Sequence, residues 1–401
     1  MEKIVIGLFF IFLVLLPFGQ LTKIPLGFLN LPEVHLYLTD VVLFLLVAVW
    51  GLWRFWGKRR KYQLPSLAKP IFVFSGLALF SLLVNFSALA GREILVAFLY
   101  WWRWLIYALF YFVVSDLIKA GRLKVLELLK FLVVIGGAVA IFGLIQYFLW
   151  PNLKALEFLG YDPHFYRLAG TFLDPGFTGI VLVLTLIIIS SSNLGKNWKS
   201  WEFWGNWGIW GIVYLALALT YSRASWLAFF FAVLLLAFFK KSWRFLLTLV
   251  VLMTLTYLIL PRPAGEGGKI ERVYTIEARL VNYQQALKVV KDNPFFGVGF
   301  NTYRYVQKNY GFLGSDWETS HSGAGVDSSL LFVLVTTGIF GLLGYLWIWL
   351  KAIQEVKRVK REEKIMIFVS LGALFIHSFF LNSLFYPWLM SWMWLLFACL
   401  S

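Results

Sequence analysis

Residues 208–239 read GIWGIVYLALALTYSRASWLAFFFAVLLLAFF and contain one charged side chain, that of Arg223. Comparable apolar runs recur from one end of the chain to the other, and many are long enough to cross about 30 Å of hydrocarbon. The runs are continuous rather than alternating, so they do not fit the strands of a membrane barrel. Lipid offers no partners to backbone N–H and C=O groups, which favours helices. The sequence therefore predicts an all-α integral membrane protein.

Composition points to the same fold class. Hydrophobic residues make up 61% of the 401 residues, charged residues make up 14%, and the mean hydropathy is +0.78. Soluble domains are about half apolar and a quarter charged, so a soluble core could not bury this much apolar surface. The net charge of +16 includes short basic clusters between apolar runs, at residues 58–61, 240–244 and 357–361. Such clusters are typical of cytoplasmic loops, and no nucleic-acid partner is expected.

We expect about twelve transmembrane helices in a single polytopic membrane domain covering residues 1–401. Their expected ranges are 4–19, 37–55, 70–88, 94–115, 127–150, 177–192, 208–222, 224–239, 245–260, 327–350, 365–381 and 387–400. The first run lacks the small-x-small cleavage pattern of a signal peptide, so we expect it to be retained as a helix. Basic residues in the short loops place the N- and C-termini in the cytoplasm.

Two long loops are expected on the outer, non-cytoplasmic side. They cover residues 151–176 and 261–326, and the second carries a helical pattern of its own over 275–292. Arg279 and Tyr283 share a stripe of that helix, which can lie against the membrane domain. No internal repeat is evident, and this weakens the inverted-repeat architecture common in transporters.

Arg223 stands at the outer junction of two expected helices. One interpretation is an anchor that reaches the lipid headgroups. The other is functional, because the turn is so short that the guanidinium is held near the junction of the two helices, close to membrane depth. A guanidinium fork there suits a phosphate or pyrophosphate better than a lysine would.

Arg279 and Arg167 lie in the two long outer loops. Each is ordinary by itself, since a solvated basic residue is the usual case. Together with Arg223, however, they put three arginines on one side of a membrane, and we expect them to form an anion clamp. A lipid-linked phosphate substrate would supply the anion.

Candidate proton acceptors on the outer side are few. Asp327 and His321 flank a glycine-containing stretch before the tenth expected helix. Asp327 can equally be a helix N-cap, and His321 an ordinary loop histidine. Asp40, at the outer end of the second helix, can cap that helix or meet the site. Arg103, inside the fourth helix, is expected to pair internally or to reach the headgroups.

Several kinds of site are excluded by the sequence. It has no zinc-ligand spacing, no Walker loop, no dinucleotide fingerprint and no Asp-x-Asp pair, and its one cysteine is Cys399. We therefore expect no metal and no cofactor. A glycosyltransferase working outside the cytoplasm, where nucleotide sugars are absent, would need a donor carried by a lipid.

Four stretches together resemble the O-antigen ligase and O-antigen polymerase superfamily. They are TYSRASW at 220–226, the Ala278-Arg279 segment through DNPFFGVGF at 292–300, DSSLLFVLVTTGIFG at 327–341, and RLAGTFLDP at 167–175. Their order and outer placement match the superfamily over roughly residues 160–345. The twelve-helix layout extends the resemblance over the whole chain.

The resemblance implies a metal-independent glycosyltransferase in the bacterial inner membrane with an active site outside the cytoplasm. Its donor would be an undecaprenyl-pyrophosphate-linked glycan, and its acceptor a second glycan or lipid A-core. Arg223 and Arg279 take the places of the family's two key arginines, which bind the departing pyrophosphate. The negative charge that develops on a departing pyrophosphate can be stabilised by preorganised guanidinium groups.

The chain departs from the family pattern at two acidic residues. Asp327 stands where the ligases have a histidine, and Asp174 stands where the first outer motif has an asparagine. A carboxylate can still act as general base toward a sugar hydroxyl. Members with an acidic residue here look more like polymerases, so we favour a surface-polysaccharide polymerase. An O-antigen ligase remains the alternative within the class, and a lipid-linked oligosaccharide flippase is the alternative of another class.

Overall fold

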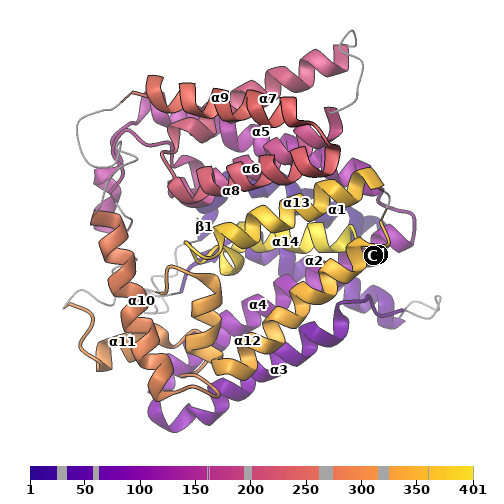
Figure 1. The fold of residues 1–401 in the computed structure, drawn as a ribbon. Helices are drawn as coiled ribbons and strands as arrows, with labels where there is room; N and C mark the ends of the chain where they lie inside the picture. The colour runs from indigo at the N-terminus through magenta and orange to yellow at the C-terminus, as the bar shows by residue number, and fades with distance from the viewer. Residues whose placement is uncertain are drawn as a thin grey trace.

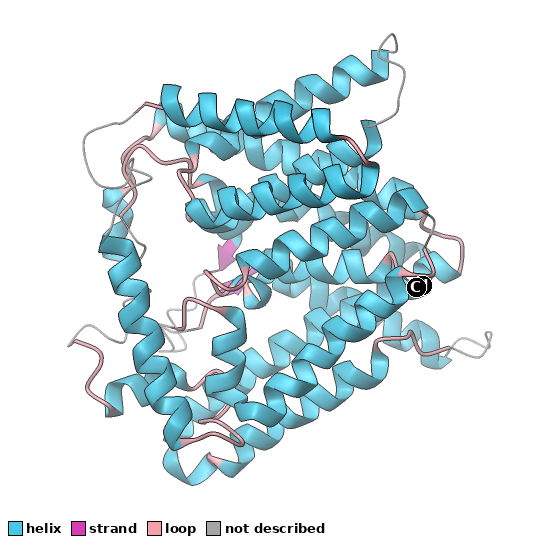
Figure 2. Cartoon of the chain, viewed as in Figure 1, coloured by secondary structure: helices cyan, strands magenta, loops and turns pink. Residues whose placement is uncertain are grey.

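The computed structural model describes residues 1–24, 34–56, 63–159, 161, 163–193, 201–261, 274–314, 325–359 and 361–400. Helices dominate these residues, as Figure 2 shows. In chain order the helices are α1 (Glu2–Leu15), α2 (Leu38–Trp56), α3 (Ala68–Val84), α4 (Gly91–Lys119), α5 (Val125–Leu149), α6 (Pro175–Asn193), α7 (Trp201–Leu219), α8 (Arg223–Lys240), α9 (Trp243–Ile259), α10 (Tyr274–Asp292), α11 (Tyr303–Asn309), α12 (Ser329–Val356), α13 (Arg361–His377) and α14 (Pro387–Ala398).

Short elements join these helices. The 3₁₀ helices are η1 (Leu16–Thr22), η3 (Phe86–Ala88), η4 (Lys154–Leu159), η5 (Gly170–Phe172) and η7 (Ser383–Phe385). Strands β1 (Lys23–Ile24) and β2 (Leu36–Tyr37) pair in antiparallel fashion, with Lys23 opposite Tyr37. Each of the twelve expected ranges coincides with a helix to within several residues, and the helix expected inside the second long loop is α10.

Five helical stretches within the described residues are long and apolar enough to cross a membrane. They are Glu2–Thr22, Gly91–Lys119, Val125–Leu149, Arg223–Lys240 and Ser329–Val356. Five further apolar helices are shorter: Ala68–Val84, Pro175–Ser191, Trp207–Leu219, Trp243–Ile259 and Pro387–Ala398. The chain is therefore an all-α membrane protein, and the count of twelve spans stays a prediction.

The helices pack in three groups, as Figure 1 shows. Helices α5 to α9 form one side of the bundle, α3, α4 and α12 form the other, and α1, α2, α13 and α14 lie between them. Contacts of α13 with α6 and α8, and of α14 with α4, join the groups. All residues of α14 are buried. A helix that is apolar on every face and enclosed by protein belongs to the centre of the bundle.

The bundle has two distinct ends. Helices α10 and α11 lie across one of them, which we name the α10 end (Figure 1). At the opposite end Arg122, between α4 and α5, forms an ion pair of 2.6 Å with Glu2, and the C-terminus lies there as well. The loop between α4 and α5 and the C-terminus, which are both expected in the cytoplasm, thus lie at the same end of the bundle.

Helix α12 is broken at Gly338, and the loop after α10 fills the break. Gly338 has a φ of 66°, outside the helical region. Backbone N–H groups of Val298 and Gly299 donate to the carbonyls of Val335 and Thr336 at 3.1 and 3.0 Å. This pairing satisfies backbone groups that the break leaves without helical partners. The glycine-rich stretch at 292–300 and the glycine of α12 are thus two halves of one structural joint.

Replacing Gly338 by alanine should prevent stable folding. A Cβ there would overlap the carbonyl of Phe295, and the positive φ strains any side chain. Gly137 in α5 is the matched control, because a Cβ on it meets nothing within 4 Å. We expect Gly338→Ala to lower the yield and melting temperature of purified protein, and Gly137→Ala to leave both unchanged or slightly raised. Equal behaviour of the two variants would contradict the proposed joint.

Candidate functional site

Arg223 is positioned by a short turn between α7 and α8. Tyr221 in this turn has a φ of 50°, a left-handed conformation that bulky residues rarely adopt. The Ser222 hydroxyl caps α8 by accepting a hydrogen bond from the backbone N–H of Ser225 at 3.4 Å. Arg223 is therefore the first residue of α8. The positive end of a helix attracts anions, so the turn combines a guanidinium group with a helix end of the same sign of charge.

Arg279 lies on α10 and approaches Asp327 from across the second long loop. Its Nε is 4.0 Å from Asp327 Oδ2, with side chains 29% and 51% exposed. Two neighbours on α10 fix this approach. Asn282 Oδ1 accepts from the backbone N–H of Asp327 at 3.0 Å, and Tyr283 donates its hydroxyl to the carbonyl of Phe379 at 2.7 Å. Helix α10 is thereby tied to the start of α12 and the end of α13.

Asp327 is not the N-cap of α12. Ser328 caps this helix, since its hydroxyl accepts from the backbone N–H of Leu331 at 3.4 Å. The Asp327 carboxylate is thus left for other partners. Its surroundings raise its pKa above the ordinary aspartate value, chiefly by desolvation, while the positive charge of Arg279 opposes this and the negative charge of Asp174 adds to it.

Arg167 and Asp174 both come from the first long loop. Arg167 donates from Nε to the carbonyl of Thr220 at 3.1 Å, which holds this loop against the Arg223 turn. Asp174 caps α6, because its Oδ1 accepts from the backbone N–H groups of Gly176 and Phe177 at 2.6 and 2.8 Å. Burial raises the pKa of Asp174, and these two hydrogen bonds together with Arg167 and Arg279 oppose the rise.

These five residues form one group, which we name the arginine–aspartate cluster: Arg167, Asp174, Arg223, Arg279 and Asp327. Arg279 is its centre, because its charge acts on Arg223, Asp174 and Asp327. The structure thus brings together, at the α10 end, residues from four separate segments of sequence. Two like-charged guanidinium groups held near one another favour an anion between them.

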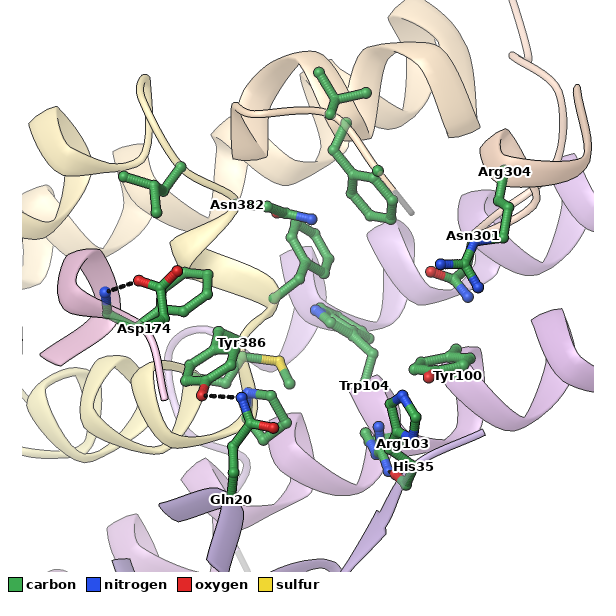
Figure 3. A pocket seen from close by; sticks show the side chains of 18 of the residues that line it. Gln20, His35, Tyr100, Arg103, Trp104, Asp174, Asn301, Arg304, Asn382 and Tyr386 are labelled. Atoms are coloured by element: carbon green, nitrogen blue, oxygen red, sulfur yellow. Dashed lines mark hydrogen bonds between the residues drawn. The ribbon is translucent and has the colours of Figure 1, made fainter. Parts of the chain in front are cut away.

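A cavity of about 400 Å³ opens beside the cluster. Asp174 and Asp327 line it, whereas the three arginines of the cluster do not. Figure 3 shows the cavity extending from Asp174 to a wall that carries Tyr100, Asn301 and Arg304. The three arginines expected to converge on a pocket are therefore not among the residues that line this cavity.

Arg103 and Asp40 form an ion pair at another wall of the cavity. Arg103 donates to Asp40 Oδ2 at 2.8 Å and to the carbonyl of His35, and Tyr107 donates its hydroxyl to Asp40 Oδ1 at 2.9 Å. Asp40 also accepts from the backbone N–H of Tyr37 at 3.0 Å, at the start of α2. Asp40 thus accepts a hydrogen bond at the start of α2 and pairs with Arg103. Of the two alternatives expected for Arg103, an internal pair or a reach to the headgroups, the structure shows the internal pair.

Replacing Asp40 by asparagine should destabilise the fold rather than alter the chemistry directly. The side chains of Arg103 and Asp40 are only 14% and 9% exposed. Removing one partner leaves a buried charge uncompensated, which costs about 3–5 kcal/mol. We expect a lower melting temperature for Asp40→Asn in detergent, partly restored in the double variant Asp40→Asn/Arg103→Gln. A single variant as stable as the wild type would refute this role.

His321 lies outside the described residues, so its place relative to Asp327 stays a prediction. Sequence reasoning missed another histidine. His377 is fully buried, with Nδ1 2.6 Å from Ser383 Oγ and Nε2 3.4 Å from Ser225 Oγ, in the first turn of α8. It links α13 to the Arg223 turn. An ionisable residue inside an expected membrane helix was the signal that could have found it.

Within the described part of the chain, no group of three or more His, Cys, Asp and Glu side chains is placed to hold a metal ion. The positive charge near the cluster is supplied by arginine side chains and by the N-terminus of α8. These groups can bind an anionic leaving group.

Residues 207–346 match a family model described as O-Antigen ligase. Over this part, about a third of its length, the chain is similar to the O-antigen ligase family, which supports its resemblance to the O-antigen ligase and polymerase superfamily. The family resemblance predicted from sequence is thus supported for three of the four motifs, and the fourth, at 167–175, precedes the matched region. The matched region contains Arg223, Arg279, Asp327 and the joint at Gly338.

No curated protein matches the chain. The match to the O-antigen ligase family model supports glycan processing of the ligase or polymerase type, with lipid-linked glycans as the general class of substrate. Three members of the cluster fall in the matched region: Arg223 in α8, Arg279 in α10, and Asp327 two residues before α12. The other two, Arg167 and Asp174, precede the matched region.

Proposed function

We propose that this protein is a glycosyltransferase that polymerises lipid-linked repeat units of a surface polysaccharide, with an undecaprenyl-pyrophosphate-linked glycan as donor. The observation that supports it most is the approach of Arg279 to the carboxylate of Asp327 at 4.0 Å, together with the electrostatic interaction of Arg279 with a second arginine, Arg223. In the proposal, the two arginines bind the leaving group and the neighbouring carboxylate is the base for the nucleophile.

The leaving group is the pyrophosphate of the donor lipid. As the bond between the anomeric carbon and the pyrophosphate oxygen breaks, negative charge develops on that oxygen. Arg223 and Arg279 bind this charge, and the N–H groups at the start of α8 add to their effect. Arginine forks match phosphate oxygens in two-point contacts, so the site stabilises undecaprenyl pyrophosphate as it departs.

The nucleophile is a hydroxyl group of the acceptor sugar. Its oxygen forms the new bond to the anomeric carbon, and its proton passes to the carboxylate of Asp327. The raised pKa of Asp327 makes the carboxylate a stronger base than an ordinary aspartate. The products are a lengthened glycan and free undecaprenyl pyrophosphate, and Asp327 then returns its proton to water.

The proposal includes an orientation. The cluster faces the outer side of the bacterial inner membrane, and both termini lie in the cytoplasm. In support, α8 runs from Arg223 to Lys240, so the basic residues 240–244 lie at the end of the bundle away from the cluster. Positive residues in short loops favour the cytoplasmic side.

The decisive experiment incubates purified protein with a lipid-linked repeat unit, with and without lipid A-core. A polymerase gives a ladder of products of increasing length without the core, and this is the result we expect. A single shift of the core would identify a ligase instead. Movement of the intact lipid-linked glycan across vesicles, with no bond formed, would identify a flippase and overturn the proposal.

A further inference from the structure

The cavity beside the cluster is lined by aromatic and amide side chains that have no part in the proposed binding of the leaving group. Aromatic side chains line it, among them Tyr100, Trp104 and Tyr386. The amide side chains of Gln20, Asn301 and Asn382 line it as well. Aromatic rings offer apolar faces and amides offer both donors and acceptors, which together match the alternating CH and OH groups of a sugar ring. Its volume of about 400 Å³ lies within the range of small-molecule sites.

The indole Nε1 of Trp104 and the side-chain oxygen of Asn382 belong to the cavity wall and are buried. Among the described residues, neither atom has a hydrogen-bond partner. Buried polar groups are normally paired, so such atoms call for an additional partner. Figure 3 shows Trp104 in the middle of the cavity, between Asn382 on one side and Tyr100 and Asn301 on the other. Rotating the Asn382 amide exchanges its donor and acceptor, so this residue can present either one to a ligand hydroxyl.

The position of Asp327 decides which substrate this cavity receives. Asp327 lines the cavity, whereas Arg223 and Arg279 do not. In a displacement at the anomeric carbon, the attacking hydroxyl and the leaving pyrophosphate stand on opposite sides of that carbon. The base must reach the attacking hydroxyl. The attacking sugar therefore enters from the cavity and the pyrophosphate lies toward the arginines.

We propose that this cavity is the acceptor-saccharide subsite, in which Trp104 and the amides of Asn301 and Asn382 bind the sugar whose hydroxyl reaches Asp327. The inference rests on the proposed transferase function and adds the place of the second substrate. It assigns the cavity to a saccharide and not to undecaprenyl pyrophosphate.

Site-directed thiol labelling tests this assignment, because the chain has one cysteine, Cys399, and it is buried. In a Cys399→Ala background, Asn301→Cys and Asn382→Cys place a thiol in the cavity wall at two positions. Gln284→Cys, exposed on α10 and outside the cavity lining, is the matched control. The probes are the repeat-unit oligosaccharide released from its lipid, and undecaprenyl pyrophosphate without sugar.

We expect the oligosaccharide, at ten times its dissociation constant, to slow maleimide labelling of both cavity variants about tenfold. Undecaprenyl pyrophosphate should leave these rates unchanged, and neither probe should affect the Gln284→Cys variant. Protection by undecaprenyl pyrophosphate, or none by the oligosaccharide at either position, would overturn the assignment. Failure of the transferase proposal would appear separately, as the absence of product from wild-type protein in the ladder assay.

Discussion

Replacing Arg279 by alanine should lower the rate of glycan transfer by about 100-fold to 1,000-fold, as expected when one preorganised donor to a developing anion is lost. Arg223→Ala should have a loss of similar size. Arg279→Lys should recover only part of the rate, because it keeps the charge without the two-point fork. The measurement is initial product formation by equal amounts of purified protein.

The matched control is Arg122→Ala at the opposite end of the bundle. This arginine is 51% exposed and pairs with Glu2, so its loss should leave transfer unchanged. The alanine variants should also retain the wild-type melting temperature, since Arg279 is partly exposed and its contact with Asp327 is long. Near-normal transfer by both Arg223→Ala and Arg279→Ala would defeat the mechanism.

Asp327→Asn should lower transfer by about 100-fold to 10,000-fold, the usual contribution of a general base. The amide keeps the shape of the side chain but cannot accept the proton. Donor binding should persist, because the arginines remain. Glu277→Gln, which changes an exposed acid at the start of α10, serves as control and should be active. A rate unaffected by Asp327→Asn would assign the base elsewhere, with His321 the next candidate.

The pH profile gives an independent check on Asp327. The base works when deprotonated, so transfer should fall as the pH drops through its pKa, and this pKa is raised above the ordinary aspartate value. Asp174→Asn removes the negative charge that raises the pKa of Asp327. The amide oxygen at position 174 can still cap α6. The acid limb of the profile should therefore move to lower pH in Asp174→Asn. A shift to higher pH would contradict the assigned neighbours.

Much of the helical layout could be predicted from sequence because each helix is a long apolar run, and lipid leaves the backbone few other structures. The break in α12 could not. Its cause is the fit between Gly338 and the carbonyl of Phe295, a contact between segments more than forty positions apart in the sequence. The burial of α14 was equally hidden, because a lipid-facing helix and a central helix have the same apolar composition.

The residues of the cluster could be named from sequence, but their contacts could be predicted only in part. The short turn at Arg223 and the helical stripe of α10 indicated two arginines on one side, and Arg279 interacts electrostatically with Arg223. The role of Ser328 as N-cap was missed, since Asp327 and Ser328 are both good caps and only the backbone conformation distinguishes them. The cavity wall could not be predicted, because Gln20, Trp104, Asn301 and Asn382 come from four unrelated segments.

The most direct test of the account is the affinity of purified protein for undecaprenyl pyrophosphate. If Arg223 and Arg279 hold the departing pyrophosphate together, each alanine variant should bind it at least about tenfold more weakly, a difference of about 1.4 kcal/mol. Asp327→Asn should bind as well as the wild type or better, because a nearby negative charge is removed. Wild-type affinity in both arginine variants would show that the two guanidinium groups do not share this anion.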